Sequence, residues 1–96
     1  MPDTQYYSLQ LHVSGRVQMV GFRYFTVNRA VRYGVTGRVR NLYDGRVEIQ
    51  AEGTKQALTM FLEDMRMGPR SAHVENVVEQ WEEISTRRYE EFGVSF

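Results

Sequence analysis

The 96-residue sequence predicts an α+β fold in which two helices cover one face of an antiparallel sheet. Short segments that alternate between apolar and polar side chains indicate strands, and two stretches with apolar residues every three or four positions indicate helices. Two strands stand between the helices, which gives the order β-α-β-β-α-β with a short strand at the end. Because this length suits one domain, we expect residues 1–96 to form a single domain.

The first half of the chain predicts a strand, a helix and a second strand. Residues 6–14 alternate between apolar and polar side chains, and the strand is expected to end at Gly15. The spacing of apolar residues predicts a helix over residues 22–33, and Gly34 stands where a glycine commonly ends a helix. Residues 35–41 predict the second strand. The apolar stripe of the helix consists of Phe22, Phe25, Thr26, Ala30 and Tyr33.

A hairpin and a second helix follow. Residues 42–45 form the predicted turn, in which Gly45 is able to take a positive φ, and residues 46–52 form the returning strand. The second helix is expected to start at Gly53-Thr54, with Thr54 as its N-cap, and to stop at Gly68-Pro69. Its apolar face consists of Ala57, Leu58, Phe61, Leu62 and Met65.

The remaining chain adds a strand within residues 74–83 and a short final strand over residues 92–96. This element order is typical of the ferredoxin-like α/β sandwich. Right-handed crossovers in that fold make the first two strands parallel, with the third strand between them. The loop after the first strand and Asn41, at the end of the second, are therefore expected at one end of the sheet, about 10 Å apart at the backbone.

Composition argues against several classes of function. The absence of cysteine removes disulfides, thiolate nucleophiles and thiolate metal sites, and His12 and His73 have no metal-ligand spacing. The formal net charge of zero argues against a dedicated nucleic-acid-binding protein. No apolar run approaches the ~18 residues of a membrane span, and the polar start Met1–Gln5 is not expected to be a secretory signal.

The charge is unevenly distributed along the chain. Residues 1–46 contain seven arginines and two aspartates, whereas the remainder contains five basic and ten acidic residues. A basic half of this kind suits a small anionic ligand, and it equally suits ordinary solvated surface charge.

The loop Gly15–Gly21 joins the first strand to the start of a helix, where unpaired backbone N–H groups favour anions. Arg23 lies in the first helical turn, so its guanidinium is able to lean back over the loop and bind a phosphate or carboxylate. Asn41 offers a donor and an acceptor at the same edge. These residues alone also fit a tight connection with a solvated arginine and a turn asparagine, so both interpretations stay open.

Three motifs resemble those of the acylphosphatases, in the same order and spacing over nearly the whole chain. They are "VSGRVQMVGFR" (Val13–Arg23), "GRVRNLYDGRVEIQAEG" (Gly37–Gly53) and "GPRSAHVENV" (Gly68–Val77). The resemblance implies a small cytoplasmic enzyme that hydrolyses acyl phosphates to a carboxylate and inorganic phosphate without a metal or other cofactor. We further expect a monomer that binds neither nucleic acid nor membranes.

The resemblance also implies roles for individual residues. It places the phosphate-binding arginine at Arg23 and the water-orienting asparagine at Asn41. It places the phosphate-binding amides in the loop formed by Arg16, Val17, Gln18, Met19 and Val20. Met19 stands where the family usually has glycine, and if the backbone needs a positive φ there, methionine costs about 1 kcal/mol or more.

The inventory of side chains suits this chemistry. A carboxylate whose conjugate acid has a pKa near ~4 leaves without a general acid, so positioning of water and stabilisation of the phosphoryl oxygens remain to be supplied. The alternative is a non-catalytic anion-binding or phosphate-binding module on the same fold. An RNA-recognition domain is disfavoured, because the predicted central strand "RVEIQAE" has no aromatic residue.

Overall fold

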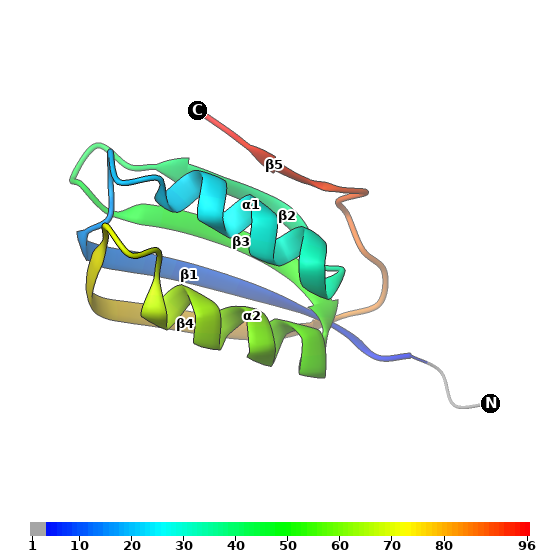
Figure 1. The fold of residues 1–96 in the computed structure, drawn as a ribbon. Coiled ribbons are helices and arrows are strands. Elements are labelled where there is room, and N and C mark those ends of the chain that lie inside the picture. Colours follow the sequence, from blue (N-terminus) through cyan, green and yellow to red (C-terminus); the bar gives the residue numbers. More distant parts are fainter. Residues whose placement is uncertain (1–3) are drawn as a thin grey trace.

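The computed structural model describes residues 4–96 and has the predicted element order. Figure 1 shows one layer of two helices lying on one layer of sheet, which confirms the ferredoxin-like α/β sandwich. Met1–Asp3, part of the start that is not expected to be a secretory signal, lie outside the described residues. Within residues 4–96, no helix combines the length and the apolar character needed to cross a membrane.

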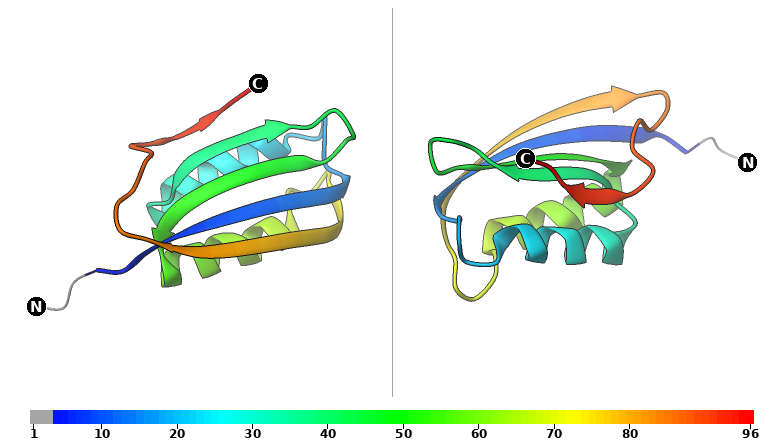
Figure 2. Two further views of the ribbon diagram at one scale, coloured as in Figure 1. Left: turned by 180° about the vertical axis from the view of Figure 1, so that it is seen from behind. Right: turned by 90° about the horizontal axis from the view of Figure 1, so that it is seen from above.

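The five strands form one sheet with the order β4-β1-β3-β2-β5. β3 therefore lies between β1 and β2, as predicted (Figure 2). The strands are β1 (Tyr6–Arg16), β2 (Thr36–Asn41), β3 (Val47–Thr54), β4 (His73–Ile84) and β5 (Phe92–Val94), and the helices are α1 (Phe22–Tyr33) and α2 (Lys55–Met67).

The sheet is antiparallel, as predicted, except at one edge, where the final strand makes it mixed. β1, β3, β4 and β2 pair in an antiparallel manner, whereas β5 runs parallel to β2. The reason lies in the path of the chain. After β4 it reverses direction, crosses to the other edge of the sheet and returns beside β2 in the direction of β2 (Figure 2).

Most strand boundaries and the start of α2 differ from the sequence predictions by one or two residues, and two of these differences have a clear structural cause. β1 continues past residue 14, because a bulge between Ser14 and Gly15 lets its pairing with β4 resume. Gly15 has φ 121°, and a Cβ at this position would lie 2.2 Å from the carbonyl oxygen of His73. β3 continues through Gly53, so α2 begins one step later than predicted, but the N-cap is confirmed: the Thr54 hydroxyl accepts from the backbone N–H of Ala57.

The core lies between the helices and the sheet. The predicted apolar stripes are confirmed on both helices and on the inner face of the sheet. The fully buried side chains there include Leu9, Leu11, Val13, Phe22, Ala30, Ile49, Leu58, Phe61 and Met65. Thr26 is also fully buried, and its hydroxyl donates to the carbonyl oxygen of Phe22, so that its polar group is satisfied.

A polar contact connects the two helices. Arg29 Nη1 and the Tyr33 hydroxyl, both on α1, donate to Asp64 Oδ2 on α2 at 3.0 and 2.7 Å. The hydrogen bond to this carboxylate raises the pKa of Tyr33. These contacts hold α1 against α2 within the helix layer.

The segment between β4 and β5 is anchored on the opposite face of the sheet. Glu52 on β3 points away from the core, because it alternates with the core residues of that strand. It is nevertheless fully buried, because the β4–β5 segment covers it. Its carboxylate accepts from the backbone N–H groups of Arg88 and Tyr89 at 2.7 and 3.1 Å, and from Arg88 Nε at 3.2 Å. The chain therefore enters β5 from a fixed position.

Candidate active site

The loop between β1 and α1 is held by two apolar side chains. Val17 is buried and Val20 packs against the core, whereas Met19 between them is 98% exposed. Met19 has φ 63°, and among residues 4–96 it is the one residue other than glycine with a positive φ. The backbone at Met19 therefore takes the positive φ at which a methionine is strained relative to glycine.

The loop and the first turn of α1 present a run of unpaired amides. Gly21, with φ 81°, is the N-cap, no side chain caps the helix, and its first turn has no acidic residue. None of the backbone N–H groups of residues 17–24 donates a hydrogen bond within the described part of the chain. Unpaired N–H groups and the helix dipole make this end of α1 electropositive.

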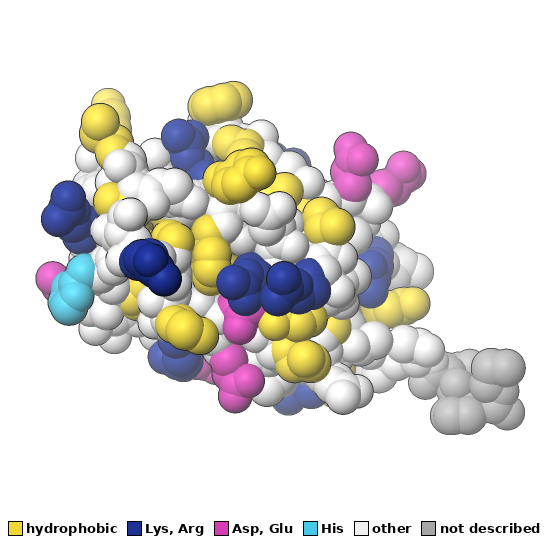
Figure 3. Space-filling model, in the orientation of Figure 1, with side chains coloured by type: hydrophobic (Ala, Val, Ile, Leu, Met, Phe, Trp, Pro, Cys, Tyr) yellow, Lys and Arg dark blue, Asp and Glu magenta, His cyan; other side chains and the backbone are white. Residues whose placement is uncertain are grey.

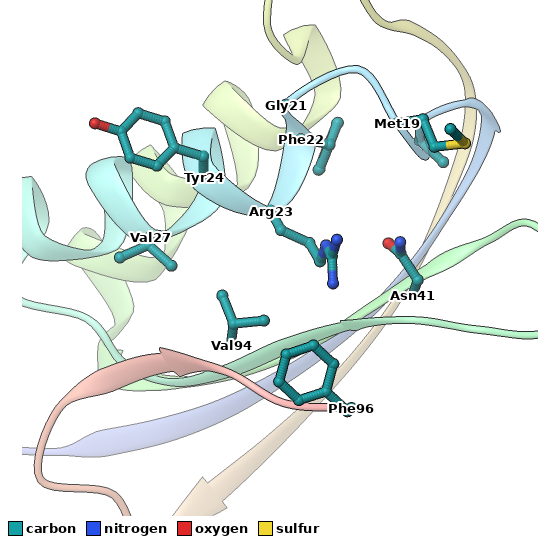
Figure 4. A pocket seen from close by; sticks show the side chains of 10 residues that line it. Met19, Gly21, Phe22, Arg23, Tyr24, Val27, Asn41, Val94 and Phe96 are labelled. Atoms are coloured by element: carbon teal, nitrogen blue, oxygen red, sulfur yellow. The ribbon is translucent and has the colours of Figure 1, made fainter.

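Arg23 and Asn41 lie beside these amides and are both available to a ligand. Arg23 is half-buried and forms no ion pair or hydrogen bond with another side chain within residues 4–96. Asn41 ends β2, and its Oδ1 is buried without a hydrogen-bond donor among the described residues. Figure 4 shows the guanidinium of Arg23 extending from α1 toward the amide of Asn41.

Gln18 connects the loop to the turn that follows Asn41. Its side-chain amide donates to the carbonyl oxygens of Leu42 and Arg46 at 2.8 and 2.9 Å. Both acceptors lie in the β2–β3 connection, so this side chain connects the loop directly to the chain beside Asn41.

The charged groups of the β2–β3 turn pair with each other. Asp44 accepts from the backbone N–H and from Nε of Arg46, at 3.1 and 2.8 Å. The backbone hydrogen bond, together with the Arg46 guanidinium, lowers the pKa of Asp44 below its usual value. The turn therefore places little net charge beside Asn41.

A pocket of about 550 Å³ brings these parts together (Figure 4). Its lining residues are Val17, Met19, Gly21, Phe22, Arg23, Tyr24, Val27, Asn41, Val94 and Phe96. Arg23 is the one charged residue among them. The pocket therefore suits an anion that carries an apolar substituent.

Comparison with known proteins decides the family. The family model named Acylphosphatase matches residues 9–94. The chain belongs to the acylphosphatase family. This confirms the resemblance seen in the three sequence motifs.

Individual acylphosphatases support the same assignment. The acylphosphatase of Thermus thermophilus is 52% identical over 71 residues, which cover 74% of this chain and 81% of that protein. The acylphosphatase of Thermotoga maritima is 45% identical over 89 residues, which cover 93% of this chain and 97% of that protein. The crystal structure of acylphosphatase from Bacillus subtilis superposes with a TM-score of 0.89 at 36% identity, covering 94% of this chain and 99% of that one.

The residues predicted to bind phosphate do not all lie in the pocket of this acylphosphatase. Val17 and Met19 line it, whereas Gln18 turns to the β2–β3 connection and Val20 packs against the core. Arg16 is the last residue of β1, where it pairs with β4 and is exposed. The side chains of Val17, Gln18 and Val20 thus support the shape of the loop, and the assignment of Arg23, Asn41 and the loop amides stays a prediction.

The apolar side of the acylphosphatase pocket was not predicted from the sequence. Tyr24 and Val27 extend it along α1, and Val94 and Phe96 extend it along β5 and the residues that follow. A signal existed for Val27, because it lies four residues after Arg23 on a helix and shares its face. No pattern indicated that β5 pairs with β2.

His12 contacts other side chains of the sheet and belongs to no cluster of metal-ligating residues within 4–96. Within the described residues, no three His, Asp or Glu side chains are grouped as a metal site requires. His12 Nε2 instead lies 3.0 Å from Glu48 Oε2, and Arg40 Nε donates to Glu48 Oε1 at 2.8 Å. These contacts are on the sheet face that the helices do not cover, where His12 has a structural partner.

Proposed function

We propose that this acylphosphatase hydrolyses acyl phosphates by in-line attack of a water molecule on a phosphate held by Arg23 and the backbone amides of residues 16–20. The observation that carries the proposal is the meeting of Arg23, Asn41 and unpaired amides at one pocket that has no acidic lining residue. Such donors stabilise the charge that the phosphoryl oxygens carry in the transition state.

Asn41 orients the attacking water in this mechanism. Its buried Oδ1 lacks a donor among the described residues, so a water O–H group is a suitable partner. The water oxygen forms a bond to phosphorus as the bond from phosphorus to the acyl oxygen breaks. The carboxylate leaves without protonation, because its conjugate acid has a pKa near ~4, and the proton of the water passes to a phosphate oxygen.

The reaction needs no metal or other cofactor in this proposal, and one copy of the chain supplies every group. We therefore propose that residues 1–96 act as one domain and as a cytoplasmic monomer, without nucleic-acid or membrane partners. Sedimentation of the active enzyme at assay concentration tests the monomer, and activity in the presence of a chelator tests the independence from metal.

Hydrolysis of acetyl phosphate by the purified chain tests the mechanism. Arg23→Ala is expected to lower kcat/KM by about 100- to 1,000-fold, because a positioned donor is lost from the transition state. Asn41→Ala is expected to lower kcat by about 100-fold while inhibition by inorganic phosphate persists, because its role is toward water. Arg32→Ala, an exposed arginine on the same helix, and Asn76→Ala, an exposed asparagine on β4, are the matched controls.

The outcomes separate the alternatives. Wild-type turnover at the spontaneous rate, with phosphate still bound, would identify a non-catalytic phosphate-binding module. Full activity of Arg23→Ala would remove the site assignment but leave the activity in place.

A further inference from the structure

We propose that Met19 is a site of reversible oxidation, and that its sulfoxide weakens anion binding at the β1–α1 loop. The oxidant is hydrogen peroxide, which converts the thioether of Met19 to a sulfoxide, and a methionine sulfoxide reductase reverses the change. This inference rests on the proposed function, because it takes the phosphate to lie at Arg23 and the loop amides. It adds a redox control of that same site.

Among residues 4–96, Met19 has the most exposed methionine side chain. It is 98% exposed, compared with 71% for Met67, 43% for Met60 and 0% for Met65. Figure 3 shows hydrophobic side chains standing out at the end of the molecule that carries the β1–α1 loop and the β2–β3 turn. Because peroxide must reach the sulfur from solvent, we expect Met19 to be oxidised first.

The fold keeps this side chain at the edge of the pocket. Met19 is one of the lining residues, and Figure 4 shows it on the loop, away from Val27 and Val94. Val17 is buried and Gln18 is hydrogen-bonded to the β2–β3 connection, so the neighbours of Met19 hold the backbone in place. The thioether therefore stays exposed at the pocket and does not withdraw into the core.

Oxidation changes the polarity of this side chain. A lone pair of the Met19 sulfur attacks one oxygen of hydrogen peroxide, so that an S–O bond forms as the O–O bond breaks. Two electrons pass from sulfur to the peroxide, and the hydroxide that leaves takes the remaining proton and becomes water. The product is a polar sulfoxide whose oxygen accepts hydrogen bonds, whereas a thioether sulfur is only a weak acceptor.

The donors near Met19 are those that the proposed phosphate needs. The backbone N–H groups of residues 17–24 donate no hydrogen bond within the described part of the chain. Arg23, which lines the same pocket, forms no ion pair within residues 4–96. Because a methionine side chain is unbranched and flexible, the sulfoxide oxygen is able to reach these donors and compete with the anion. Oxidation of Met19 therefore lowers the affinity for phosphate.

Peroxide treatment of the purified chain tests this inference, with peptide mapping by mass spectrometry to locate the added oxygen. When Met19 is converted to the sulfoxide, we expect the affinity for inorganic phosphate, measured by calorimetry, to fall at least about fivefold. Treatment with a methionine sulfoxide reductase is expected to restore it. Unchanged phosphate affinity in a sample with fully oxidised Met19 would overturn the proposal.

Matched variants assign the effect to one sulfur. Met19→Leu keeps an apolar side chain of similar size that peroxide does not oxidise, so its phosphate affinity is expected to stay at its own untreated value. Met67→Leu removes an exposed methionine at the end of α2, outside the pocket, and is expected to lose affinity on treatment as the wild type does. Loss of affinity in treated Met19→Leu would place the effect at another residue and contradict the proposal.

Phosphate binding separates this inference from the proposed function, since it needs no turnover. A chain that loses phosphate affinity on oxidation of Met19 but hydrolyses no acyl phosphate would remove the hydrolase and retain the redox control. Acetyl phosphate turnover with the same kcat/KM before and after oxidation of Met19 would do the reverse.

Discussion

The backbone at Met19 takes a conformation that glycine adopts without strain. Its φ of 63° lies in the left-handed region, and its side chain, 98% exposed, gains almost no packing in return. The conformation persists because its neighbours determine it: Val17 is buried, Val20 packs on the core and Gln18 is hydrogen-bonded. The loop therefore keeps a glycine-like path without the glycine.

Two substitutions separate the strain at Met19 from the loss of its side chain. We expect Met19→Gly to be more stable than Met19→Ala by about 0.5 to 1 kcal/mol, because alanine keeps the left-handed strain that glycine relieves, and the greater freedom of unfolded glycine offsets only part of this. Urea unfolding of both variants measures the difference. Equal stability of the two, or a more stable alanine variant, would show that the backbone at this position is not strained.

The meeting of Arg23 and Asn41 at one pocket was predictable from the sequence, whereas their roles stay a prediction. The family motifs single out both residues, and the element order alone puts them at one end of the sheet. Phe96 was not predictable in the same way. Phe96 lies outside the three family motifs. Its place in the pocket depends on the parallel pairing of β5 with β2, which the residue pattern of β5 does not predict.

At the scale of elements, the loop before α1 and the turn after β2 behave as one unit. The Gln18 side chain donates to carbonyl oxygens of Leu42 and Arg46, so the β1–α1 loop and the strand end with Asn41 are fixed to each other. The Gln18 side-chain amide thus connects the β1–α1 loop to the β2–β3 turn, although the two are far apart in sequence.

Removal of this connection should loosen the site more than the fold. We expect Gln18→Ala to lower the unfolding free energy by about 1 to 2 kcal/mol, through two lost hydrogen bonds, and kcat/KM by about tenfold, through misplacement of the loop. Denaturant unfolding and acetyl phosphate kinetics measure the two effects. Gln56→Ala, an exposed residue of α2, is the control, and normal kinetics in Gln18→Ala would refute the coupling.

The helices and four of the strands were predictable because their patterns are long and periodic. The burial of Glu52 was not, because alternation along β3 places it on the outer face, and the cover comes from the distant residues Arg88 and Tyr89. The segment between β4 and β5, which contains Arg88 and Tyr89, also determines where β5 begins. Long-range cover of this kind leaves no periodic pattern in the covered strand, so the sequence predicted β5 without its partner.

At the scale of the whole molecule, the open face of the sheet makes stability depend on pH. Burial tends to raise the pKa of Glu48, but the hydrogen bonds with His12 and Arg40 outweigh it and hold this pKa below its ordinary value of 4.5. A carboxylate with a lowered pKa in the folded state stabilises the protein fully above its unfolded pKa. That contribution is lost as pH falls through the folded pKa.

Glu48→Gln tests this dependence. The difference in unfolding free energy between wild type and variant is expected to be largest near neutral pH and to shrink below pH 4.5, since protonated glutamate resembles glutamine. Urea unfolding from about pH 7 to about pH 3 provides the measurement. Glu83→Gln, exposed on β4, is the control, and a difference that stays constant across this range would contradict the assignment.

The parallel pairing of β5 with β2 also affects how copies of the chain meet in solution. An uncovered β2 would present free N–H and C=O groups to the strand of another molecule, which is a common start of aggregation. β4, the opposite edge, is protected differently, because it carries exposed glutamates that repel a second copy. The short strand β5, which contributes Val94 to the pocket, therefore also covers the edge of the sheet at β2, and mutations that release it should lower solubility.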